Sequence, residues 1–183
     1  MRLYWRNLLS FHFYGLYFTN TGETAKRQQR ILMKINFLDY LDKRGILFLS
    51  ETTKNEVLDA MIVRASELCR VPVNILKDAV WERERKVSTG LGNGLALPHV
   101  RLTRFGEPLV LMGISSDGID DYQTTDDSVI DLVLMLIADG RDTDLYLELM
   151  KSAILKLKTR ENIEAIKKCG PDPAAILSLL RRL

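Results

Sequence analysis

The residues that could carry chemistry gather in one short stretch, 88–99, which reads Ser-Thr-Gly-Leu-Gly-Asn-Gly-Leu-Ala-Leu-Pro-His. Its glycines stand at alternate positions and allow positive φ or the close approach of a neighbouring segment. The spacing excludes a dinucleotide fingerprint, which requires glycine where Leu95 stands, and the Gly-Lys-Ser/Thr of a P-loop is absent. The turn leads instead into a predicted strand over 95–97. Pro98 then restricts the backbone and holds His99 at a defined angle.

His99 is one of two histidines, and the other, His12, lies near the N-terminus. This count excludes a multi-histidine zinc site. A nucleophilic cysteine–histidine pair with Cys69 or Cys169 stays open, although no local signature supports it. A single neutral imidazole can act as a nucleophile towards a phosphoryl donor. The alternative is a histidine that serves packing or hydrogen bonding alone.

A phosphorylated histidine requires donors for its new anionic group. Backbone N–H groups, the hydroxyls of Ser88 and Thr89 and an arginine all lie within the sixteen residues before His99. Residue types alone leave the phospho-acceptor and the structural interpretation both open, because spacing along a chain does not prove convergence in space.

Charge is distributed unevenly along the chain. Residues 1–32 carry a net charge of +4, and the remaining 151 residues carry −2. A slightly acidic body argues against a nucleic-acid partner, since duplex recognition uses clustered cations. The two cysteines are far apart and indicate free thiols in a reducing compartment, so a cytoplasmic location is expected.

The first 32 residues are expected to be an extension that the domain does not need. Residues 3–18 are rich in Leu, Phe and Tyr but are too short and too interrupted to span a bilayer. Contact with a membrane surface through this segment is the alternative. The domain itself is expected to cover residues 33–183.

The elements that must position His99 follow from hydrophobic periodicity and capping residues. Apolar runs predict strands over 46–49, 109–114 and 129–137, and the last suits a central strand covered on both faces. Capping signals predict helices after Thr53-Lys-Asn-Glu56, after Pro72, over 143–157, after Thr159 and after Asp172-Pro173. Strands interleaved with helices indicate an α/β sandwich in a single domain.

The expected inward faces of two helices can be named. They hold Ile75, Leu76, Ala79 and Val80 in the helix after Pro72, and Leu145, Leu149, Met150, Ala153 and Leu157 in the helix over 143–157.

The stretch before His99 resembles the active-site signature of type-2 enzyme IIA domains of the phosphoenolpyruvate-dependent sugar phosphotransferase system. The signature has an acidic or amide residue, six free positions, an aliphatic, a small residue and two free positions, followed by aliphatic-Ala-aliphatic-Pro-His. Here these are Glu84, residues 85–90, Leu91, Gly92, residues 93–94 and Leu95-Ala96-Leu97-Pro98-His99. The residues that usually flank it in the family also match Arg83-Glu84, Ser88-Thr89-Gly90 and Gly92-Asn93-Gly94. The resemblance extends from about Met33 to the C-terminus.

The resemblance implies a mixed β-sheet flanked by helices, and it makes His99 the acceptor of phosphate. The donor would be the histidine-containing phosphocarrier protein or its nitrogen-branch relative. Arg83 would help to hold the phosphoryl group, with Thr89 as a neighbour in preference to Ser88. Neither the residues nor the resemblance calls for a cofactor or a metal.

One departure from the family concerns its second active-site histidine, which usually stands near the start of the helix after the central strand. Tyr146 occupies that place, or Asp144 if the preceding loop is shifted. A tyrosine can donate a hydrogen bond to a phosphate but cannot become cationic.

Three functions are compatible with these features. The first is a nitrogen-regulatory type of regulator controlled by its phosphorylation state, and the second is a fructose/mannitol-type carrier that passes phosphate to a IIB domain. The third, a stand-alone hydrolase, has little support. The substituted histidine and the lack of a fused transporter segment in this sequence favour the regulator.

Overall fold

The centre of the fold is strand β6 (Ile130–Asp139), in which all ten residues are buried. The computed structural model describes residues 35–183, so the expectations for the N-terminal extension lie outside the described residues. β6 belongs to a six-stranded sheet with the order β1-β5-β6-β3-β2, and β4 also pairs with β6. The prediction of a central strand covered on both faces is confirmed.

The sheet is mixed, as the resemblance implied. β1 (Ile46–Leu49) runs parallel to β5 (Leu109–Ile119), and β5 runs antiparallel to β6. On the other edge of β6, β3 (Leu95–Ala96) and β4 (His99–Leu102) follow one another, and both run parallel to it. β2 (Gly90–Gly92) completes a short hairpin with β3. The chain therefore delivers His99 to the start of a strand that is held by the buried centre of the sheet.

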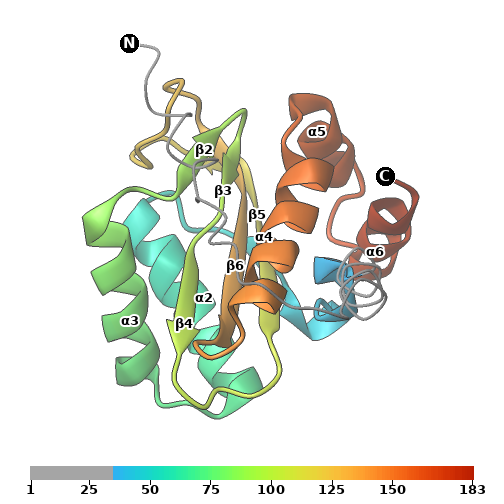
Figure 1. The fold of residues 1–183 in the computed structure, drawn as a ribbon. Coiled ribbons are helices and arrows are strands. Elements are labelled where there is room, and N and C mark those ends of the chain that lie inside the picture. Colours follow the sequence, from blue (N-terminus) through green and yellow to red (C-terminus); the bar gives the residue numbers. More distant parts are fainter. Residues whose placement is uncertain (1–34) are drawn as a thin grey trace, which may run out of the picture. The chain divides into compact units, whose positions relative to one another are not determined.

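Helices cover both faces of the sheet (Figure 1). One layer holds α2 (Lys54–Cys69) and α3 (Val73–Lys86). The other holds α4 (Thr143–Leu157), α5 (Arg160–Lys168) and α6 (Pro173–Arg182), together with the short 3-10 turns η2 (Phe37–Asp39) and η3 (Lys43–Gly45). The expected α/β sandwich is confirmed.

Two hydrophobic cores form because successive side chains of a strand point to opposite faces of the sheet. Along β6, Leu132 and Leu134 belong to the core under α4, α5 and α6. Val133 and Met135, which alternate with them, belong to the core under α2 and α3. A one-residue slip of β6 would exchange the two sets, so its apolar sequence and register together define both layers.

Capping residues begin the helices where the sequence predicts. Thr53, Thr159 and Asp172 each accept a hydrogen bond from a backbone N–H in the first turn of α2, α5 and α6. The Thr53–Glu56 spacing also predicts a capping box, in which the Glu56 carboxylate accepts a hydrogen bond from the Thr53 backbone N–H. That second bond is absent. The Glu56 carboxylate instead accepts a 2.7 Å hydrogen bond from the Thr53 hydroxyl.

Some predicted bounds and faces need correction. β5 runs to Ile119, beyond the predicted end at 114, and β3 ends at Ala96. Ile75 is 48% exposed, whereas Leu76 and Val80 are buried and Ala79 packs against the same core, as predicted. Leu145 and Met150 are half-buried at the edge of their core. Within residues 35–183, no helix is both long and apolar enough to cross a membrane.

Candidate functional site

His99 is the first residue of β4, and its imidazole has a defined orientation. Its Nδ1 lies 2.7 Å from the backbone oxygen of Leu97. A carbonyl oxygen can only accept, so Nδ1 carries the proton and Nε2 carries the lone pair. The expectation that the chain before His99 holds the ring at a fixed angle thus has a physical basis in the carbonyl two residues earlier.

Arg83 comes from the last turn of α3 and contacts the reactive nitrogen directly. Its Nε donates to Nε2 of His99 at 3.0 Å, and its Nη1 donates to the backbone oxygen of Val87 at 2.8 Å. The second bond anchors one side of the guanidinium while the other faces His99. Arg83 therefore already lies at the atom to which a phosphoryl group would bond.

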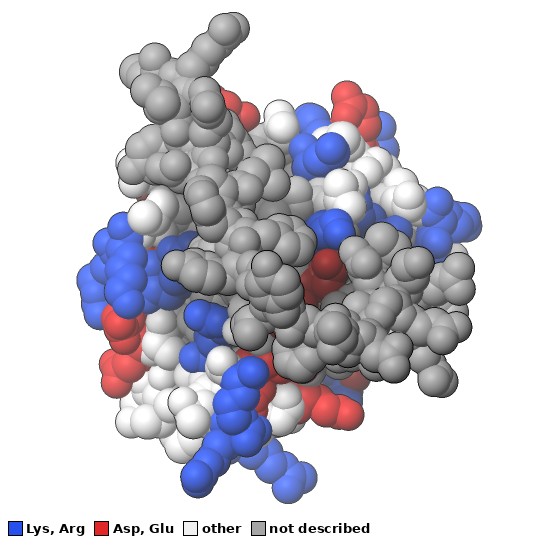
Figure 2. All heavy atoms as spheres, in the orientation of Figure 1, with Lys and Arg blue, Asp and Glu red and all other residues white. Residues whose placement is uncertain are grey.

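An open pocket of about 280 Å³ lies in front of the histidine. Its lining comes from α3, β4 and the first turn of α4, and consists of Ala79, Glu82, Arg83, Lys86, His99, Val100, Arg101 and Tyr146. Glu82, the acid of this set, forms an ion pair with Lys86 at 2.7 Å. Figure 2 shows Lys and Arg side chains gathered around the C-terminal end of α3 and at the far end of β4. The pocket is thus cationic and suits an anion.

Tyr146, which the sequence predicts in place of the family's second histidine, lies against the ring of His99. The Tyr146 ring centroid lies 5.9 Å from that of His99, at an interplanar angle of 56°. The alternative, Asp144, is exposed and does not line the pocket. Of the two residues that the sequence proposed for this place, the structure brings Tyr146 to the site.

Thr89 is placed differently from the sequence expectation. Its hydroxyl donates to Glu84 Oε2 at 2.7 Å and its N–H donates to Glu84 Oε1 at 3.0 Å. The residue is buried and does not line the pocket. The Ser88 hydroxyl donates to the backbone oxygen of Gln123 at 2.6 Å. Both hydroxyls therefore hold the protein together rather than face His99.

The glycine-rich turn also serves packing. The N–H of Asn93 donates to Asp126 at 2.8 Å and the N–H of Gly94 donates to Ser128 at 3.2 Å. A Cβ on Gly90 would lie 2.4 Å from the backbone oxygen of Gln123. The glycines thus allow this turn to lie against the segment before β6. The sequence offered backbone N–H groups, two hydroxyls and an arginine as donors. Of these groups in residues 83–94, only the arginine has a hydrogen bond to the imidazole of His99.

A buried network of polar side chains is centred on Glu84, next to the site residue Arg83. Glu84 follows Arg83 on α3 and forms an ion pair with Lys54 at 2.8 Å. Thr89 connects it to the Tyr122 hydroxyl at 2.8 Å. Burial raises the pKa of the Glu84 carboxyl, but the bonds from Lys54 and Thr89 outweigh it and hold the pKa below its ordinary value. Glu84 is therefore a buried carboxylate that joins α2, α3 and the residue just before β2.

Sequence reasoning missed Lys54, Tyr122 and Arg101. Lys54 and Tyr122 lie well outside the signature, on either side of it, and nothing in their local pattern indicates the contact. The sequence does indicate a place near His99 for Arg101, because Arg101 stands two residues after it. Residues two apart on a strand share a face of the sheet.

Burial and positive neighbours keep His99 neutral. The pKa of His99 is lowered from 6.5 to about 4, mainly because the ring is buried, and the charges of Arg83 and Arg101 act in the same direction. The bond to the Leu97 oxygen and the charge of Glu84 oppose them. At neutral pH the ring is uncharged with a free lone pair on Nε2, which is the form that a nucleophile requires.

We expect the His99 ring signals in an NMR titration to change near pH 4 instead of near 6.5. The unfolded chain then binds a proton more readily than the folded one. Stability contributed by neutral His99 is complete above about pH 6.5 and is lost as the pH falls towards 4. A midpoint at or above 6.5 in the folded protein would contradict the described environment.

Metal and thiol chemistry receive no support from the described residues. Across residues 35–183, no cluster of three His, Cys, Asp or Glu side chains could hold a metal ion. Cys69 and Cys169 pack at the edges of opposite cores, and neither lines the His99 pocket. A cysteine–histidine pair is thereby removed from the alternatives.

Solved structures share this fold. The nitrogen regulatory protein IIA-Ntr from Neisseria meningitidis aligns with a TM-score of 0.68 and 16% identity, over 82% of this chain and 99% of that one. The enzyme IIA mannitol of Escherichia coli, in its complex with phosphorylated enzyme IIB mannitol, aligns with a TM-score of 0.63 and 19% identity, over 78% and 98%. The fold is therefore that of IIA proteins.

Sequence comparisons agree. The family described as phosphoenolpyruvate-dependent sugar phosphotransferase system, EIIA 2, matches residues 39–182. The fructose-specific EIIABC component of Bacillus subtilis is 30% identical over 152 residues, which are 82% of this chain and 23% of that protein. A nitrogen regulatory protein of Pseudomonas aeruginosa is 25% identical over 138 residues, 75% of this chain and 88% of that protein. The chain belongs to the EIIA 2 family of the sugar phosphotransferase system.

Proposed function

We propose that a histidine-containing phosphocarrier protein phosphorylates this chain on Nε2 of His99. The observation that carries the proposal is the hydrogen bond from Nδ1 to the Leu97 oxygen, which leaves Nε2 as the nucleophile beside Arg83. In the transfer, the bond between phosphorus and the donor's imidazole breaks and a bond from phosphorus to Nε2 forms. The Nδ1 proton stays hydrogen-bonded to the Leu97 oxygen, and this bond strengthens as the ring becomes positive.

Arg83 would also bind the phosphoryl group during the transfer. Its Nε–H, which is bonded to Nε2 before the reaction, is released when the lone pair attacks phosphorus. The guanidinium is then free to bind the phosphoryl oxygens, where charge is spread in the transition state. A planar fork of donors suits this task better than an ammonium group.

A regulatory use of the phosphorylated state is the first candidate for the role of phospho-His99. The resemblance places Tyr146 where the family usually has its second histidine, and a tyrosine cannot become cationic. Slow onward transfer would make phospho-His99 long-lived, which suits a signal read by other proteins. The similarity to nitrogen regulatory proteins supports the same choice.

Phosphate transfer to a IIB domain in fructose- or mannitol-type uptake is the second candidate. It is favoured by Arg101, whose guanidinium lies against Tyr146 and lines the same pocket. The mannitol relative was solved together with phosphorylated enzyme IIB mannitol, which supports a IIB partner here.

The test is to incubate the protein with phosphoenolpyruvate, enzyme I and the phosphocarrier, and to locate the phosphate by NMR. We expect one acid-labile phosphoryl group, with phosphorus coupled to Nε2 of His99. Phosphorus on Nδ1, on another residue or nowhere would contradict the proposal.

A chase of the labelled protein with IIB domains separates the two candidates. A regulator keeps its label over many turnovers of the donor system, whereas a carrier loses it to IIB at the rate of donor phosphorylation. Complete transfer within one donor turnover would reject the regulatory candidate.

A further inference from the structure

Arg101 lies beside Tyr146 and carries a positive charge, which a tyrosine cannot. The Arg101 guanidinium carbon lies 5.3 Å from the Tyr146 ring centroid, within the range of a cation–π contact. The same ring lies 5.9 Å from the His99 ring. Arg101, Tyr146 and His99 all line the pocket, so the Tyr146 ring lies against both the arginine and the histidine of one site.

The charge of Arg101 is not neutralised by the described part of the chain. No carboxylate among residues 35–183 lies within 4.0 Å of its guanidinium. Its hydrogen bond within that range goes from Nη1 to the Thr143 hydroxyl at 3.3 Å, whereas an arginine has five N–H donors. Most of its donors and its full charge are therefore available to an anion in the pocket.

Arg83 and Arg101 reach the pocket from different elements. Arg83 comes from the end of α3, and Arg101 comes from β4, two residues beyond His99. Two cations that approach one histidine from separate elements match a phosphoryl group, which carries its charge on several oxygens. One cation alone would leave part of that charge to water.

We propose that Arg101, packed on the ring of Tyr146, is a second phosphoryl-binding cation of the His99 site and that Tyr146 is its positioning residue. This rests on the proposed function. Tyr146 then acts through its aromatic face, not through its hydroxyl. The substitution of the family's histidine is compensated by a cation on the neighbouring strand.

A small-molecule phosphoryl donor tests the proposal without any docking protein. Phosphoramidate transfers its phosphoryl group to Nε2 as its P–N bond breaks and ammonia leaves, and ³¹P NMR detects phosphohistidine formation. We expect Arg101→Gln to slow this reaction at least about tenfold, less than the 10²–10³-fold known for a donor in a closed site because Arg101 is exposed.

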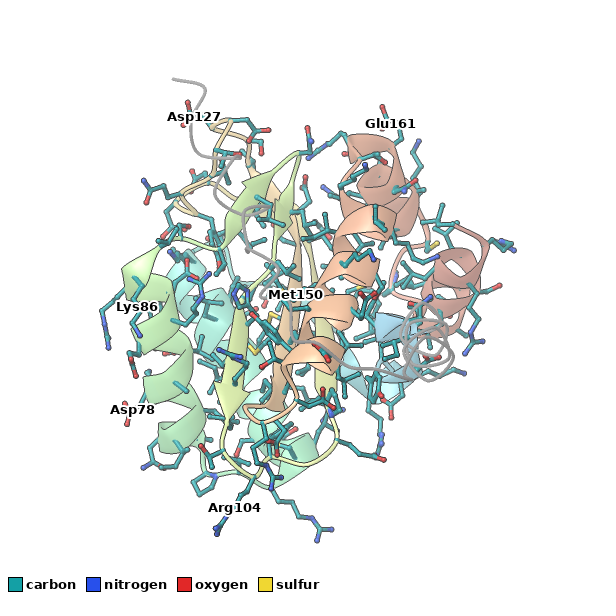
Figure 3. All side chains as sticks on the ribbon, viewed as in Figure 1. Asp78, Lys86, Arg104, Asp127, Met150 and Glu161 are labelled. Atoms are coloured by element: carbon teal, nitrogen blue, oxygen red, sulfur yellow. The ribbon has the colours of Figure 1, made fainter. Side chains whose placement is uncertain are left out.

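The matched control is Arg104→Gln, which removes the same charge three residues later. Arg104 is exposed, lies outside the pocket and points away from the protein at the end of β4 (Figure 3). We expect its rate to stay within about twofold of the parent, as for a remote surface charge. Equal rates for Arg101→Gln and the parent, or equal slowing by both variants, would overturn the proposal.

Two Tyr146 variants test the positioning role. If the ring supports Arg101, Tyr146→Ala slows the reaction more than Tyr146→Phe, because phenylalanine retains the aromatic face. Equal losses in both would assign the effect to the hydroxyl and overturn the positioning role. The double variant, with Tyr146→Ala and Arg101→Gln, should react only slightly more slowly than Arg101→Gln alone, since both substitutions act through one contact.

Binding of inorganic phosphate separates this proposal from the proposed function. The His99 ring signals are recorded while phosphate is added to the parent, Arg101→Gln and Arg104→Gln. We expect the apparent Kd to rise at least about fivefold in Arg101→Gln alone, as the loss of a charge-assisted hydrogen bond predicts. A parent that binds phosphate but is never phosphorylated would reject the proposed function and leave Arg101 supported, whereas an unchanged Kd in Arg101→Gln would reject Arg101.

Discussion

We expect replacement of His99 with glutamine to reduce acid-labile phosphate incorporation from one group per chain to background. Glutamine has a similar size and polarity, but its amide nitrogen has no nucleophilic lone pair. Because His99 is half-buried on a strand paired with β6, a polar residue of similar volume leaves the fold intact. The measurement is label incorporation from phosphoenolpyruvate through enzyme I and the phosphocarrier, with circular dichroism as the check on folding.

The matched control for this prediction is the second histidine of the chain. His12 lies outside the residues that match the family, so His12→Gln should take up the label as the parent does. Stoichiometric label in His99→Gln, or its loss in His12→Gln, would show that the phosphoryl group goes elsewhere. A folded but unlabelled His99→Gln with a normal His12→Gln assigns the reaction to the His99 imidazole.

We expect replacement of Glu84 with glutamine to lower the free energy of unfolding by about 3 kcal/mol, the lower end of the range for removing one partner of a buried ion pair. The Glu84 side chain is 2% exposed and its Lys54 partner 17% exposed. Glutamine keeps the volume but leaves the ammonium of Lys54 without its countercharge. Lys54 retains limited access to water, which is why the lower end applies. Urea unfolding monitored by circular dichroism measures the change.

Glu82 provides the control on the same helix. Its ion pair with Lys86 lies at the surface, with both side chains about two-thirds exposed. Glu82→Gln should therefore change stability by less than about 1 kcal/mol. Comparable losses of unfolding free energy in Glu82→Gln and Glu84→Gln would mean that the buried network around Lys54 and Thr89 stabilises the fold no more than a surface ion pair does.

The effect of Glu84→Gln also depends on pH in a defined direction. The folded state holds the pKa of Glu84 below its ordinary value, so the unfolded chain binds a proton more readily at acid pH. The stability from ionised Glu84 is present above about pH 4.3 and is lost as the pH falls through the folded pKa. The gap between the parent and Glu84→Gln should thus be widest near neutrality and narrow below about pH 4. A gap that widens in acid would contradict the assigned pairing.

The sequence by itself determined the family, the candidate acceptor and most of the elements. The signature runs continuously from Glu84 to His99, and its residues are informative because their order along the chain is itself the pattern. The apolar run of β6 identified the central strand, and Thr159 and Asp172 identified helix starts, because hydrophobic periodicity and capping are local effects. Arg83 was also placed correctly beside His99.

Only the tertiary structure decided which groups share the pocket. Thr89 and the glycine turn are nearer to His99 in sequence than Arg83 is, yet their donors bind Glu84 and the segment before β6. Arg101 and Tyr146 are 45 residues apart in the chain and meet because β4 and α4 flank the same end of β6. Contacts of this kind depend on strand order and helix placement, which no local pattern encodes. The contact between Arg101 and Tyr146 is therefore evident only in the tertiary structure.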